Sequence, residues 1–275
     1  MIWSIKGIKI FGFWNVKAFI FLIISWLKPI GGRNFLNTYS ILFSNLVNCT
    51  KVNLMGKNLS DYRKNYIKGE LLETEIPENP LDLFHVWFDE MEMVLKYRKE
   101  LNDSVEANAM TVATIGTDGF PKSRIVLLKE FSEEGFIFFT NYNSEKGLSL
   151  LNNSHTCLSF FWAGLERQVI IKGTAEKTSE EKSISYFNSR PRGSQLGAWA
   201  SNQSSEIESR EILTNNLREL ELKFKDSDIP KPENWGGFLV RPENFEFWQG
   251  RSNRLHDRIL YYKDRGSWNI KRLAP

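Results

Sequence analysis

The chain has 275 residues, of which 41% are hydrophobic and 13% aromatic, and its formal net charge at pH 7 is +3. This composition is typical of a folded globular protein and excludes an intrinsically disordered chain. Only two cysteines and three histidines are present, so the sequence predicts neither a disulfide framework nor a metal cluster of the usual ligand spacing.

The positive charge is concentrated in the first sixty residues. They contain six lysines, one arginine and no acidic residue. Since the whole chain carries +3, residues 61–275 carry −4. A mildly acidic body argues against a nucleic-acid partner.

An apolar run at residues 18–27 follows Lys6, Lys9 and Lys17. A positive region before a short apolar run is typical of a targeting segment, and the run is shorter than the roughly 20 residues that span a bilayer. Three interpretations stay open: a targeting or transit segment, a misassigned start with Met55 as the first residue, and a membrane anchor. We therefore expect an N-terminal extension at residues 1–54 and a folded domain at residues 55–275. The domain itself should have no stable membrane association, and its location should be cytoplasmic or, with a transit segment, mitochondrial or plastid.

The folded domain begins with a predicted helix and continues as short strands. Apolar residues near a 3.6-residue spacing predict helix across residues 61–101, with Asn79-Pro80 as a start signal. Strands are predicted at residues 110–115, 124–129, 135–140, 155–162, 167–175, 237–241, 245–249, 257–262 and 268–272, and further helices at 144–151, 179–188 and 205–224. Short strands joined by hairpins, without strand–helix alternation, predict an α+β, mainly β fold: an antiparallel β-barrel with flanking helices.

Two groups of basic residues suggest anion binding. Arg124 and Lys129 bracket four apolar residues, which predicts a mostly buried strand with a cation near each end. Buried cations need partners, so two separate anions would explain two separate cations; ordinary strand-end charges are the alternative. Arg254, His256 and Arg258 are spaced by two, which would place them on one face of a strand. Either an anion lies between them or they guard a solvated edge strand.

A third candidate group of anion-binding residues lies on both sides of Pro191 in the sequence. Tyr186 and Arg190 share a helix face, Pro191 ends that helix near residue 189, and Ser194 follows in a predicted polar loop at residues 189–204. Arginine, tyrosine and serine together suit a phosphate group. Gln203-Ser204, before the next predicted helix, resembles an anion site at a helix N-terminus. Trp248 either covers a flat ring or belongs to the core.

Several longer segments carry a resemblance to a known family. They are Arg124-Ile-Val-Leu-Leu-Lys129, Phe139-Thr-Asn141, Leu165-Glu-Arg-Gln-Val169, Tyr186-Phe-Asn-Ser-Arg-Pro-Arg192, Ser194-Gln-Leu-Gly-Ala-Trp199, Gln203-Ser-Ser205, Glu246-Phe-Trp-Gln-Gly250, Arg254-Leu-His-Asp-Arg258 and Arg272-Leu-Ala-Pro275. Together they resemble the pyridoxamine 5′-phosphate oxidase family, in order across residues 61–275. Residues 1–54 have no counterpart in this resemblance.

The resemblance implies an FMN-binding split barrel, an antiparallel Greek-key β-barrel, that works as a homodimer with each flavin at the subunit interface. It implies oxidation of pyridoxamine 5′-phosphate or pyridoxine 5′-phosphate to pyridoxal 5′-phosphate. O2 is the acceptor, H2O2 is released, and the amine substrate also releases NH3. Such an enzyme serves vitamin B6 cofactor biosynthesis and salvage.

Site residues follow from the same resemblance, position by position. The implied FMN contacts are Arg124, Ile125, Val126, Leu127, Leu128, Lys129, Phe139, Thr140, Lys146, Gln168, Gln203, Ser204, Trp248 and Arg258. The implied substrate contacts are Arg63, Tyr66, Lys129, Tyr186, Arg190, Ser194, Arg254, Leu255 and His256. Among these, Arg254 and His256 are expected to orient the substrate ring and to assist charge or proton changes at its C4′ atom. Arg63 and Tyr66 belong to a segment that resembles the family's cover over the substrate.

One departure and two rival functions accompany this interpretation. Glu145 stands where many family members have a second basic residue beside Lys146, and we expect its carboxylate to point outward and to weaken FMN binding somewhat. The rivals are a split-barrel flavoprotein with another substrate or a deazaflavin, and a non-catalytic protein that carries or senses FMN or pyridoxal phosphate. Peroxide release on addition of pyridoxamine 5′-phosphate discriminates among them.

Overall fold

A computed structural model describes residues 4–5, 8–9, 58–98 and 106–275 of the chain. The chain divides into two units, residues 1–63 and 64–275, and each is described by itself. In the first unit, β1 (Ser4–Ile5) and β2 (Ile8–Lys9) pair as a short antiparallel hairpin. The apolar run at residues 18–27 and the expected domain boundary at residues 54–55 lie outside the described residues.

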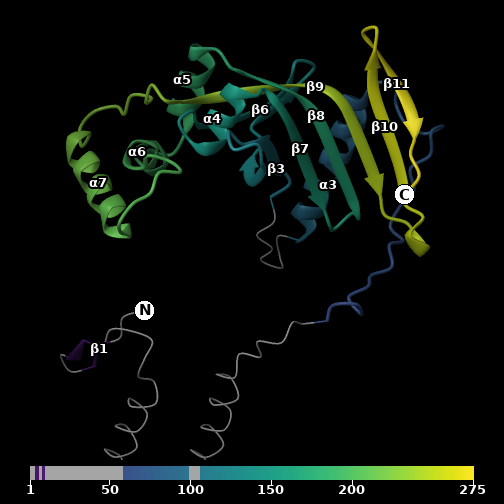
Figure 1. The fold of residues 1–275 in the computed structure, drawn as a ribbon, viewed down its shortest axis with the longest axis horizontal. Coiled ribbons are helices and arrows are strands. Elements are labelled where there is room, and N and C mark those ends of the chain that lie inside the picture. Colours follow the sequence, from purple (N-terminus) through teal and green to yellow (C-terminus); the bar gives the residue numbers. More distant parts are fainter. Residues whose placement is uncertain (1–3, 6–7, 10–57, 99–105) are drawn as a thin grey trace, which may run out of the picture. The chain divides into compact units, whose positions relative to one another are not determined.

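A curled antiparallel sheet forms the frame of the second unit (Figure 1). Its strands are β3 (Ala109–Ile115), β4 (Pro121–Leu127), β5 (Glu130–Ser132), β6 (Gly135–Asn141), β7 (His155–Trp162), β8 (Arg167–Lys177), β9 (Trp235–Gln249), β10 (Asp257–Asp264) and β11 (Ser267–Arg272). The main path runs β11-β10-β9-β8-β7-β3-β4. Strand β9 pairs with β8 along its length, with β6 through its first half and with β10 through its second half. This sharing of one long strand curls the sheet, and the predicted mainly β architecture is confirmed.

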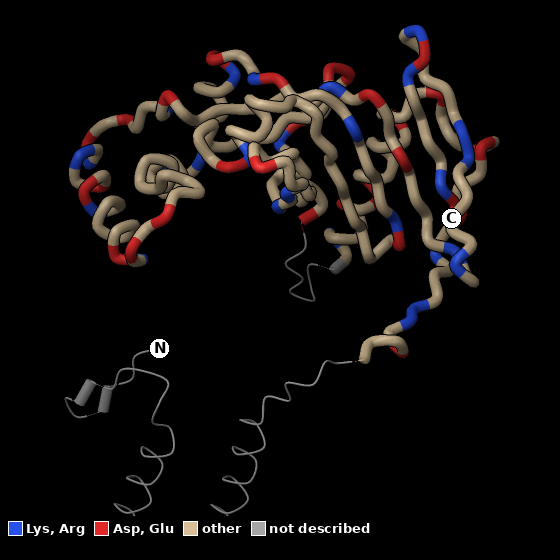
Figure 2. Tube along the Cα trace, in the orientation of Figure 1, with Lys and Arg blue, Asp and Glu red and all other residues tan. Residues whose placement is uncertain are grey.

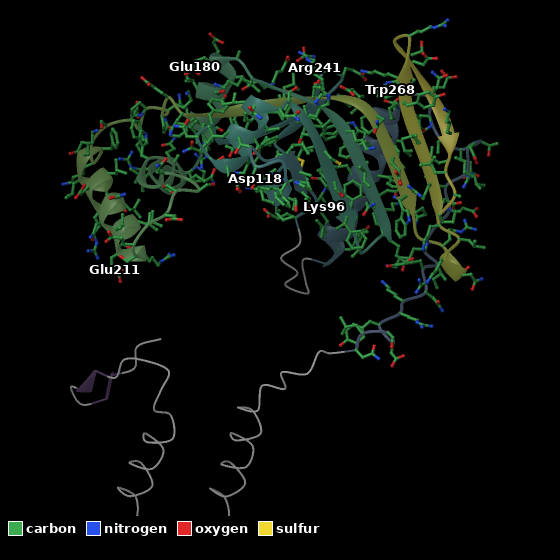
Figure 3. The ribbon with its side chains drawn as sticks, viewed as in Figure 1. Lys96, Asp118, Glu180, Glu211, Arg241 and Trp268 are labelled. Carbon is green, nitrogen blue, oxygen red and sulfur yellow. The ribbon has the colours of Figure 1, made fainter. Side chains whose placement is uncertain are left out.

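Helix α3 (Pro80–Arg98) covers one face of the sheet with a stripe of aromatic residues. The ring of Phe84 lies 5.1 Å from that of Phe136 on β6 and 5.2 Å from that of Phe160 on β7. Trp87 meets Phe247 of β9 edge-on at 5.2 Å. At the β11 edge of the sheet, the ring of Trp268 packs against that of Phe245 on β9, with centroids 5.5 Å apart (Figure 3). These rings are the main apolar core, and edge-to-face pairs are the geometry that aromatic side chains prefer.

The remaining helices stand at the other end of the sheet (Figure 1). They are α4 (Glu145–Asn152), α5 (Glu180–Ser189), α6 (Arg192–Ala200) and α7 (Arg210–Lys223). A second, smaller core joins α5, α6 and the segment after α7 to the first residue of β9, through Phe187, Leu196, Phe224, Ile229 and Trp235. This core holds the α5–α6 junction beside β6 and β9.

Three predicted elements differ from the structure. The helix predicted to start at residue 61 starts at Pro80, and residues 61–79 are not helical. Backbone N–H groups of Ile67, Lys68 and Leu71 bond to distant carboxylates instead of to a preceding turn. Residues 237–241 and 245–249 form one strand rather than two, since β9 accommodates Glu243 as a bulge opposite Lys172 and Gly173 of β8.

The third difference concerns residues 189–204, which we predicted to be a loop. They contain α6, whose Leu196 and Ala200 are buried, so packing on the second core makes this polar sequence helical. The next helix begins at Arg210 rather than at residue 205. Gln203 and Ser204 therefore do not stand at a helix N-terminus, and that part of the prediction is wrong.

Candidate functional site

A cavity of about 1140 Å³ opens between β4, the end of β6, the start of α4 and the α5–α6 junction. Its charged lining is strongly unbalanced: the cations are Lys122, Arg124, Lys129, Lys146 and Arg190, and the one carboxylate is that of Glu145. We call it the cationic cavity. Five cations facing one carboxylate predict an anionic ligand.

Lys146 lies in the first turn of α4, whose N-cap is Ser144. Its side chain is only 9% exposed, and its Nζ atom bonds Thr140 Oγ1 and Gln203 Oε1, each at 3.1 Å. Burial, with the nearby charge of Arg124, lowers the pKa of Lys146. Among the described residues no carboxylate lies within ion-pair distance of Lys146, so a phosphate at this helix N-terminus would satisfy an incompletely compensated charge.

Within the part of the chain that the structure describes, Arg124 on β4 bonds only neutral oxygens. Its Nη1 atom donates to Thr114 Oγ1 at 2.8 Å, to the Lys122 carbonyl at 3.1 Å and to the Val112 carbonyl at 3.2 Å. Burial lowers the pKa of Arg124. Strand β4 is not the mostly buried strand that we predicted, because Ile125 is 66% exposed and alternate residues face solvent in this single chain.

Arg190 is the clearest candidate in the cavity for contact with an anionic ligand. It caps the C-terminus of α5, and its guanidinium lies over the Trp235 ring at 4.7 Å. Its Nη1 atom is buried and has no hydrogen-bond partner among the described residues, and burial lowers the pKa of the group. A buried donor without a partner costs about 1–3 kcal/mol, more when it is charged. Such a group persists where a ligand supplies the missing acceptor.

The neighbours of Arg190 add aromatic rings and a serine hydroxyl to the same cavity. The Tyr186 ring stacks on that of Phe139 at 3.9 Å, and Phe139 stacks in turn on Trp235 at 5.6 Å. Ser194 lies in the first turn of α6 and lines the same cavity. The predicted group of Tyr186, Arg190 and Ser194 is thus brought together. Trp235, which the sequence analysis did not single out, forms its base, and no motif marked that residue.

A second group of predicted residues lies away from the cationic cavity, where β9 ends and β10 begins. The aromatic cluster, as we call it, consists of Tyr66, Trp248 and His256, with ring centroids 4.7 to 5.7 Å apart. Trp248 is half-buried on the face of β9 opposite the buried Phe247, so the alternative that Trp248 belongs to the core is wrong. Gln168 of β8 faces Trp248 across the sheet ladder.

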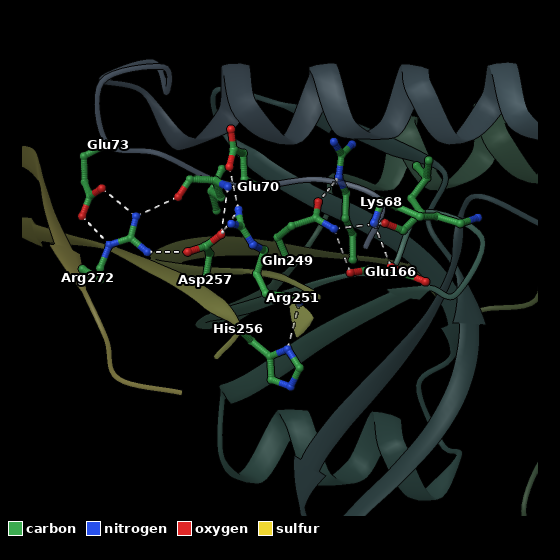
Figure 4. Close-up of polar contacts among 12 residues, drawn as sticks. Lys68, Glu70, Glu73, Glu166, Gln249, Arg251, His256, Asp257 and Arg272 are labelled. Carbon is green, nitrogen blue, oxygen red and sulfur yellow. Dashed lines mark hydrogen bonds and ion pairs between the residues drawn. The ribbon is translucent and has the colours of Figure 1, made fainter. Parts of the chain in front are cut away.

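His256 has a defined hydrogen-bonding state in this cluster. Its Nδ1 atom accepts the backbone N–H of Arg251 at 3.0 Å (Figure 4). Because a neutral imidazole accepts at one nitrogen and donates at the other, Nε2 carries the proton in the neutral ring. His256 therefore presents an N–H donor on its free side.

Arg254, His256 and Arg258 do not share a strand face, so that prediction is wrong. Residues Ser252–Arg254 form a single 3₁₀ turn in which Asn253 and Arg254 have positive φ angles of 55° and 62°, and β10 starts only at Asp257. Leu255 is exposed beside the turn. Arg258 is already paired, through Nε to Glu246 at 2.8 Å and through Nη1 to the Ala274 carbonyl at 2.8 Å.

The predicted residues therefore divide into two sets within one chain. Those that line the cationic cavity are Arg124, Ile125, Val126, Leu127, Lys129, Phe139, Thr140, Lys146, Tyr186, Arg190, Ser194, Gln203 and Ser204. Those at the β8–β10 end are Tyr66, Gln168, Trp248, Arg254, Leu255, His256 and Arg258. Leu128 is a buried core residue, and Arg63, which bonds Ser60 through Nε at 3.1 Å, belongs to the first unit.

Among the described residues no group of side chains suits a metal ion, and no helix there has the length and apolar character needed to cross a membrane.

Comparison with known proteins agrees with this architecture. The model of the family described as pyridoxamine 5′-phosphate oxidase matches residues 96–224, and that of the pyridoxine 5′-phosphate oxidase C-terminal dimerisation region matches residues 235–275. A pyridoxine/pyridoxamine 5′-phosphate oxidase of Flavobacterium johnsoniae is 61% identical over 218 residues, which cover 79% of this chain and 99% of that protein. Its counterpart in Nostoc punctiforme is 50% identical, over 80% of this chain and all of its own length.

Solved structures show the same fold. PhzG from Burkholderia lata, in complex with tetrahydrophenazine-1-carboxylic acid, superposes with a TM-score of 0.65 at 27% identity, covering 74% of this chain and 98% of its own. A pyridoxamine 5′-phosphate oxidase-related, FMN-binding protein from Nostoc punctiforme gives a TM-score of 0.50 at 16% identity, over 67% and 96% of the two chains. Two family models match residues 96–224 and 235–275, and a 61% identical relative is covered over 99% of its length. The chain therefore belongs to the pyridoxamine 5′-phosphate oxidase family.

Proposed function

We propose that the chain binds FMN and oxidises pyridoxamine 5′-phosphate and pyridoxine 5′-phosphate to pyridoxal 5′-phosphate, with O2 as acceptor and release of H2O2, and of NH3 from the amine. The relatives that match it over most of their length carry this name. The observation that carries the proposal is the buried, unpartnered Nη1 of Arg190 in a cavity that already has a second buried cation, Lys146. Two separate cations suit two separate phosphates.

The residues present fit FMN at one end of the cavity. Lys146, Arg124 and Ser204 would hold the flavin phosphate, with Gln203 bridging Lys146 and Thr140. The apolar residues of β4 would lie along the ring system. Bound FMN would supply the redox chemistry that no side chain of the cavity provides. What the protein contributes is the position and environment of both ligands.

The substrate phosphate would bind at the other end, on Arg190, Tyr186, Ser194 and Lys129. Fixing both phosphates aligns the two reacting rings, and such positioning is worth several orders of magnitude in rate. Arg254 and His256 would orient the substrate ring. The N–H at His256 Nε2, fixed by the bond at Nδ1, would donate to the substrate near C4′.

We also propose that each active site is built by two subunits. The matched C-terminal dimerisation region supports a homodimer, and Arg254, His256 and Trp248 lie outside the cavity of their own chain. In a two-fold symmetric dimer, the aromatic cluster of one protomer would close the cationic cavity of its partner. Three exposed apolar residues support an interface on this sheet: Phe120 just before β4, Ile125 on β4 and Phe161 on β7.

The oxidase proposal is tested by peroxide release from the purified, FMN-loaded protein. Pyridoxamine 5′-phosphate should be oxidised, and pyridoxamine without the phosphate should react at least about 100-fold less efficiently, because Arg190 and its neighbours lose their ligand. No peroxide with FMN bound would favour a carrier or sensor. Equal use of both amines would favour a flavoprotein with another substrate, such as the carboxylate-bearing ring found in the PhzG complex.

The shared site is tested by complementation. Arg190→Ala alters the cavity, and the double variant Arg254→Ala/His256→Ala alters the opposite set. If the two sets meet across the dimer, co-expressed subunits form hybrids with one intact site, and activity returns to roughly a quarter of the unmodified level. Activity no higher than that of either variant alone contradicts a shared site.

The domain organisation is a further proposal. The relatives match about four fifths of this chain while being covered at 99–100% of their own length. This supports a catalytic domain at residues 55–275 and a separate extension at residues 1–54, whose charge and apolar run suit a targeting segment. N-terminal sequencing of the mature native protein tests the assignment, since a first residue near Met1 contradicts a removed segment.

A further inference from the structure

Residues 64–71, which we call the strap, have neither helix nor strand structure, yet the strap's backbone is bonded at two points. The first point is Glu166, in the turn between β7 and β8. Its side chain is 1% exposed, and its Oε2 atom accepts the N–H of Ile67 at 2.8 Å and of Lys68 at 3.1 Å (Figure 4). Burial by itself would raise the pKa of Glu166, but these two N–H groups and Lys64 hold it below its usual range. Glu166 is thus a buried, charged acceptor for the strap.

The second point is Asp257, the first residue of β10. Its Oδ2 atom accepts the N–H of Leu71 at 3.1 Å, and Arg272 links the same two residues by donating to Asp257 Oδ1 and to the Leu71 carbonyl, each at 2.7 Å. Arg251 also donates to Asp257 Oδ2, at 3.3 Å. The carboxylate lies next in sequence to His256, so the end of the strap is fixed to the His256 turn.

Tyr66 lies beside the first of these two points and beside the His256 turn. Its ring stands edge-on to Trp248 at 5.6 Å and to His256 at 5.7 Å. Gly250 makes room for it, because a Cβ atom on Gly250 would lie 2.7 Å from Tyr66 Cγ. The N–H of Gly250 donates to the Glu166 carbonyl at 2.8 Å, so the Glu166 turn holds both the strap and the surface on which Tyr66 packs.

We infer that Glu166 and Asp257 are positioning residues, which hold the strap so that the Tyr66 ring is fixed against Trp248 and His256 and so set the orientation of the substrate ring. The inference rests on the proposed oxidase function for its effect on turnover. A segment without regular structure is ordered only at a cost in conformational entropy. Here two carboxylates, rather than a backbone ladder, supply the bonds that offset it. Neither carboxylate is itself an expected substrate contact, so we expect each to act through the strap and Tyr66.

Steady-state kinetics of the FMN-loaded full chain test this role. Glu166→Ala removes the acceptor of both N–H groups and should lower kcat/KM for pyridoxamine 5′-phosphate about tenfold, while the FMN Kd changes less than about twofold. Glu166→Gln keeps one carbonyl oxygen and should retain most of the activity. Glu75→Gln, an exposed carboxylate farther along the same segment, is the matched control and should behave as the unmodified protein.

A double-mutant cycle separates positioning from general stabilisation. If Glu166 acts through Tyr66, Glu166→Ala should cause no further loss of kcat/KM in a Tyr66→Ala background, because the ring to be positioned is already absent. Full additivity of the two losses overturns the inference. Asp257→Asn preserves packing and gives the same test, should Glu166→Ala fail to fold.

Limited trypsin digestion tests the strap independently of catalysis. Cleavage after Lys64 and Lys68 requires the strap to leave its place, so Glu166→Ala and Asp257→Asn should be cut there about tenfold faster than the unmodified chain and than Glu75→Gln. Equal cleavage rates overturn the inference even where the protein is an active oxidase. Absence of peroxide from the unmodified protein contradicts the proposed function instead, and the digestion still decides whether the carboxylates hold the strap.

Discussion

The cationic cavity and the β9–β11 end of the sheet are both rich in arginine and lysine, but they compensate those charges in opposite ways. At the sheet end, Arg272 bonds Glu73 and Asp257, and Arg258 bonds Glu246. In the cavity, Arg124 and Lys146 bond only neutral oxygens, and Arg190 leaves a buried donor unpaired. Figure 2 shows the ordinary surface pattern for comparison, with both signs of charge mixed along α7.

This difference separates cations that stabilise the fold from cations that we expect to bind a ligand. A buried charge without a partner destabilises the folded chain, whereas an arginine shared between two carboxylates ties distant segments together. The cavity cations should therefore lower the stability of the ligand-free protein and raise the stability of its complex with the ligands. The sheet-end cations should support the fold whether or not ligands are bound.

Removal of Arg190 should have the largest effect. Arg190→Ala takes away the charge proposed for the substrate phosphate, so kcat/KM for pyridoxamine 5′-phosphate should fall about 100-fold, while the FMN Kd changes little. The ligand-free protein should unfold at the same or a higher urea concentration, since a desolvated cation is gone. Arg218→Ala, on the exposed face of α7, should change neither value. A clear loss of ligand-free stability in Arg190→Ala would assign Arg190 to the fold.

Lys146→Met should act on the flavin instead. FMN affinity should fall about 30-fold, the loss of one charge-assisted contact to a phosphate with some compensation from Arg124. Fluorescence titration of FMN measures it, and kcat at saturating FMN should change much less. An unchanged FMN affinity places the flavin phosphate elsewhere.

The same lysine predicts a pH dependence of the ligand-free protein. Burial lowers the pKa of Lys146 below its ordinary value of 10.5. The unfolded chain therefore binds more protons between the lowered pKa and 10.5, and the contribution of Lys146 to stability rises with pH through that window. Urea unfolding of Lys146→Met should lack this rise. A rise of equal size in both proteins would assign it to other groups.

Glu73 gives the opposite case at the sheet end. Its bonds to Arg272 lower its pKa from 4.5 to about 2. A depressed carboxylate pKa contributes stability that is present above about pH 4.5 and is lost as pH falls through about 2. Glu73→Gln should therefore flatten the acid side of the stability profile, measured by urea midpoints. Glu75→Gln should leave the profile unchanged, and the same flattening in both variants would exclude a specific Glu73–Arg272 pair.

The two regions also differ in how much the sequence revealed of them. Local patterns predicted most strands, since alternation and β-branched residues are properties of neighbouring positions, and the bounds of β7 at His155 and Trp162 were correct. The group of Tyr186, Arg190 and Ser194 was recognisable because helical spacing alone places its first two members together. The helix α6 escaped prediction because its burial depends on Phe224 and Trp235, which are distant in sequence.

The strap and the His256 turn show what local patterns miss. Glu166 belongs to a run that carries the family resemblance, but no local pattern marked its carboxylate, whose role depends on partners about 100 positions earlier in the chain. The spacing of Arg254, His256 and Arg258 suggested a strand, but positive φ angles at Asn253 and Arg254 turn the chain before β10 begins. The separation of Trp248 and His256 from the cavity of their own chain is likewise a property of the assembled fold.

Glu145 is the exception to the positive charge of the cationic cavity, because it is the one carboxylate among the described residues that line it. It is about half exposed, and Lys122 holds it at 2.5 Å while also pairing with Asp118 at 3.0 Å. Solvent and Lys122 therefore screen most of its repulsion toward a flavin phosphate.

The expected gain from removing this charge is accordingly small. Glu145→Gln should tighten FMN binding about twofold and Glu145→Arg about fivefold, since the second change also adds a cation. Asp118→Asn frees Lys122 from its other partner without changing the cavity lining and serves as the control. The gains should shrink at high salt, because the charges involved are exposed. If Glu145→Arg binds FMN no more tightly than the unmodified chain, the carboxylate does not weaken flavin binding, and charge balance in the cavity is set by its buried cations alone.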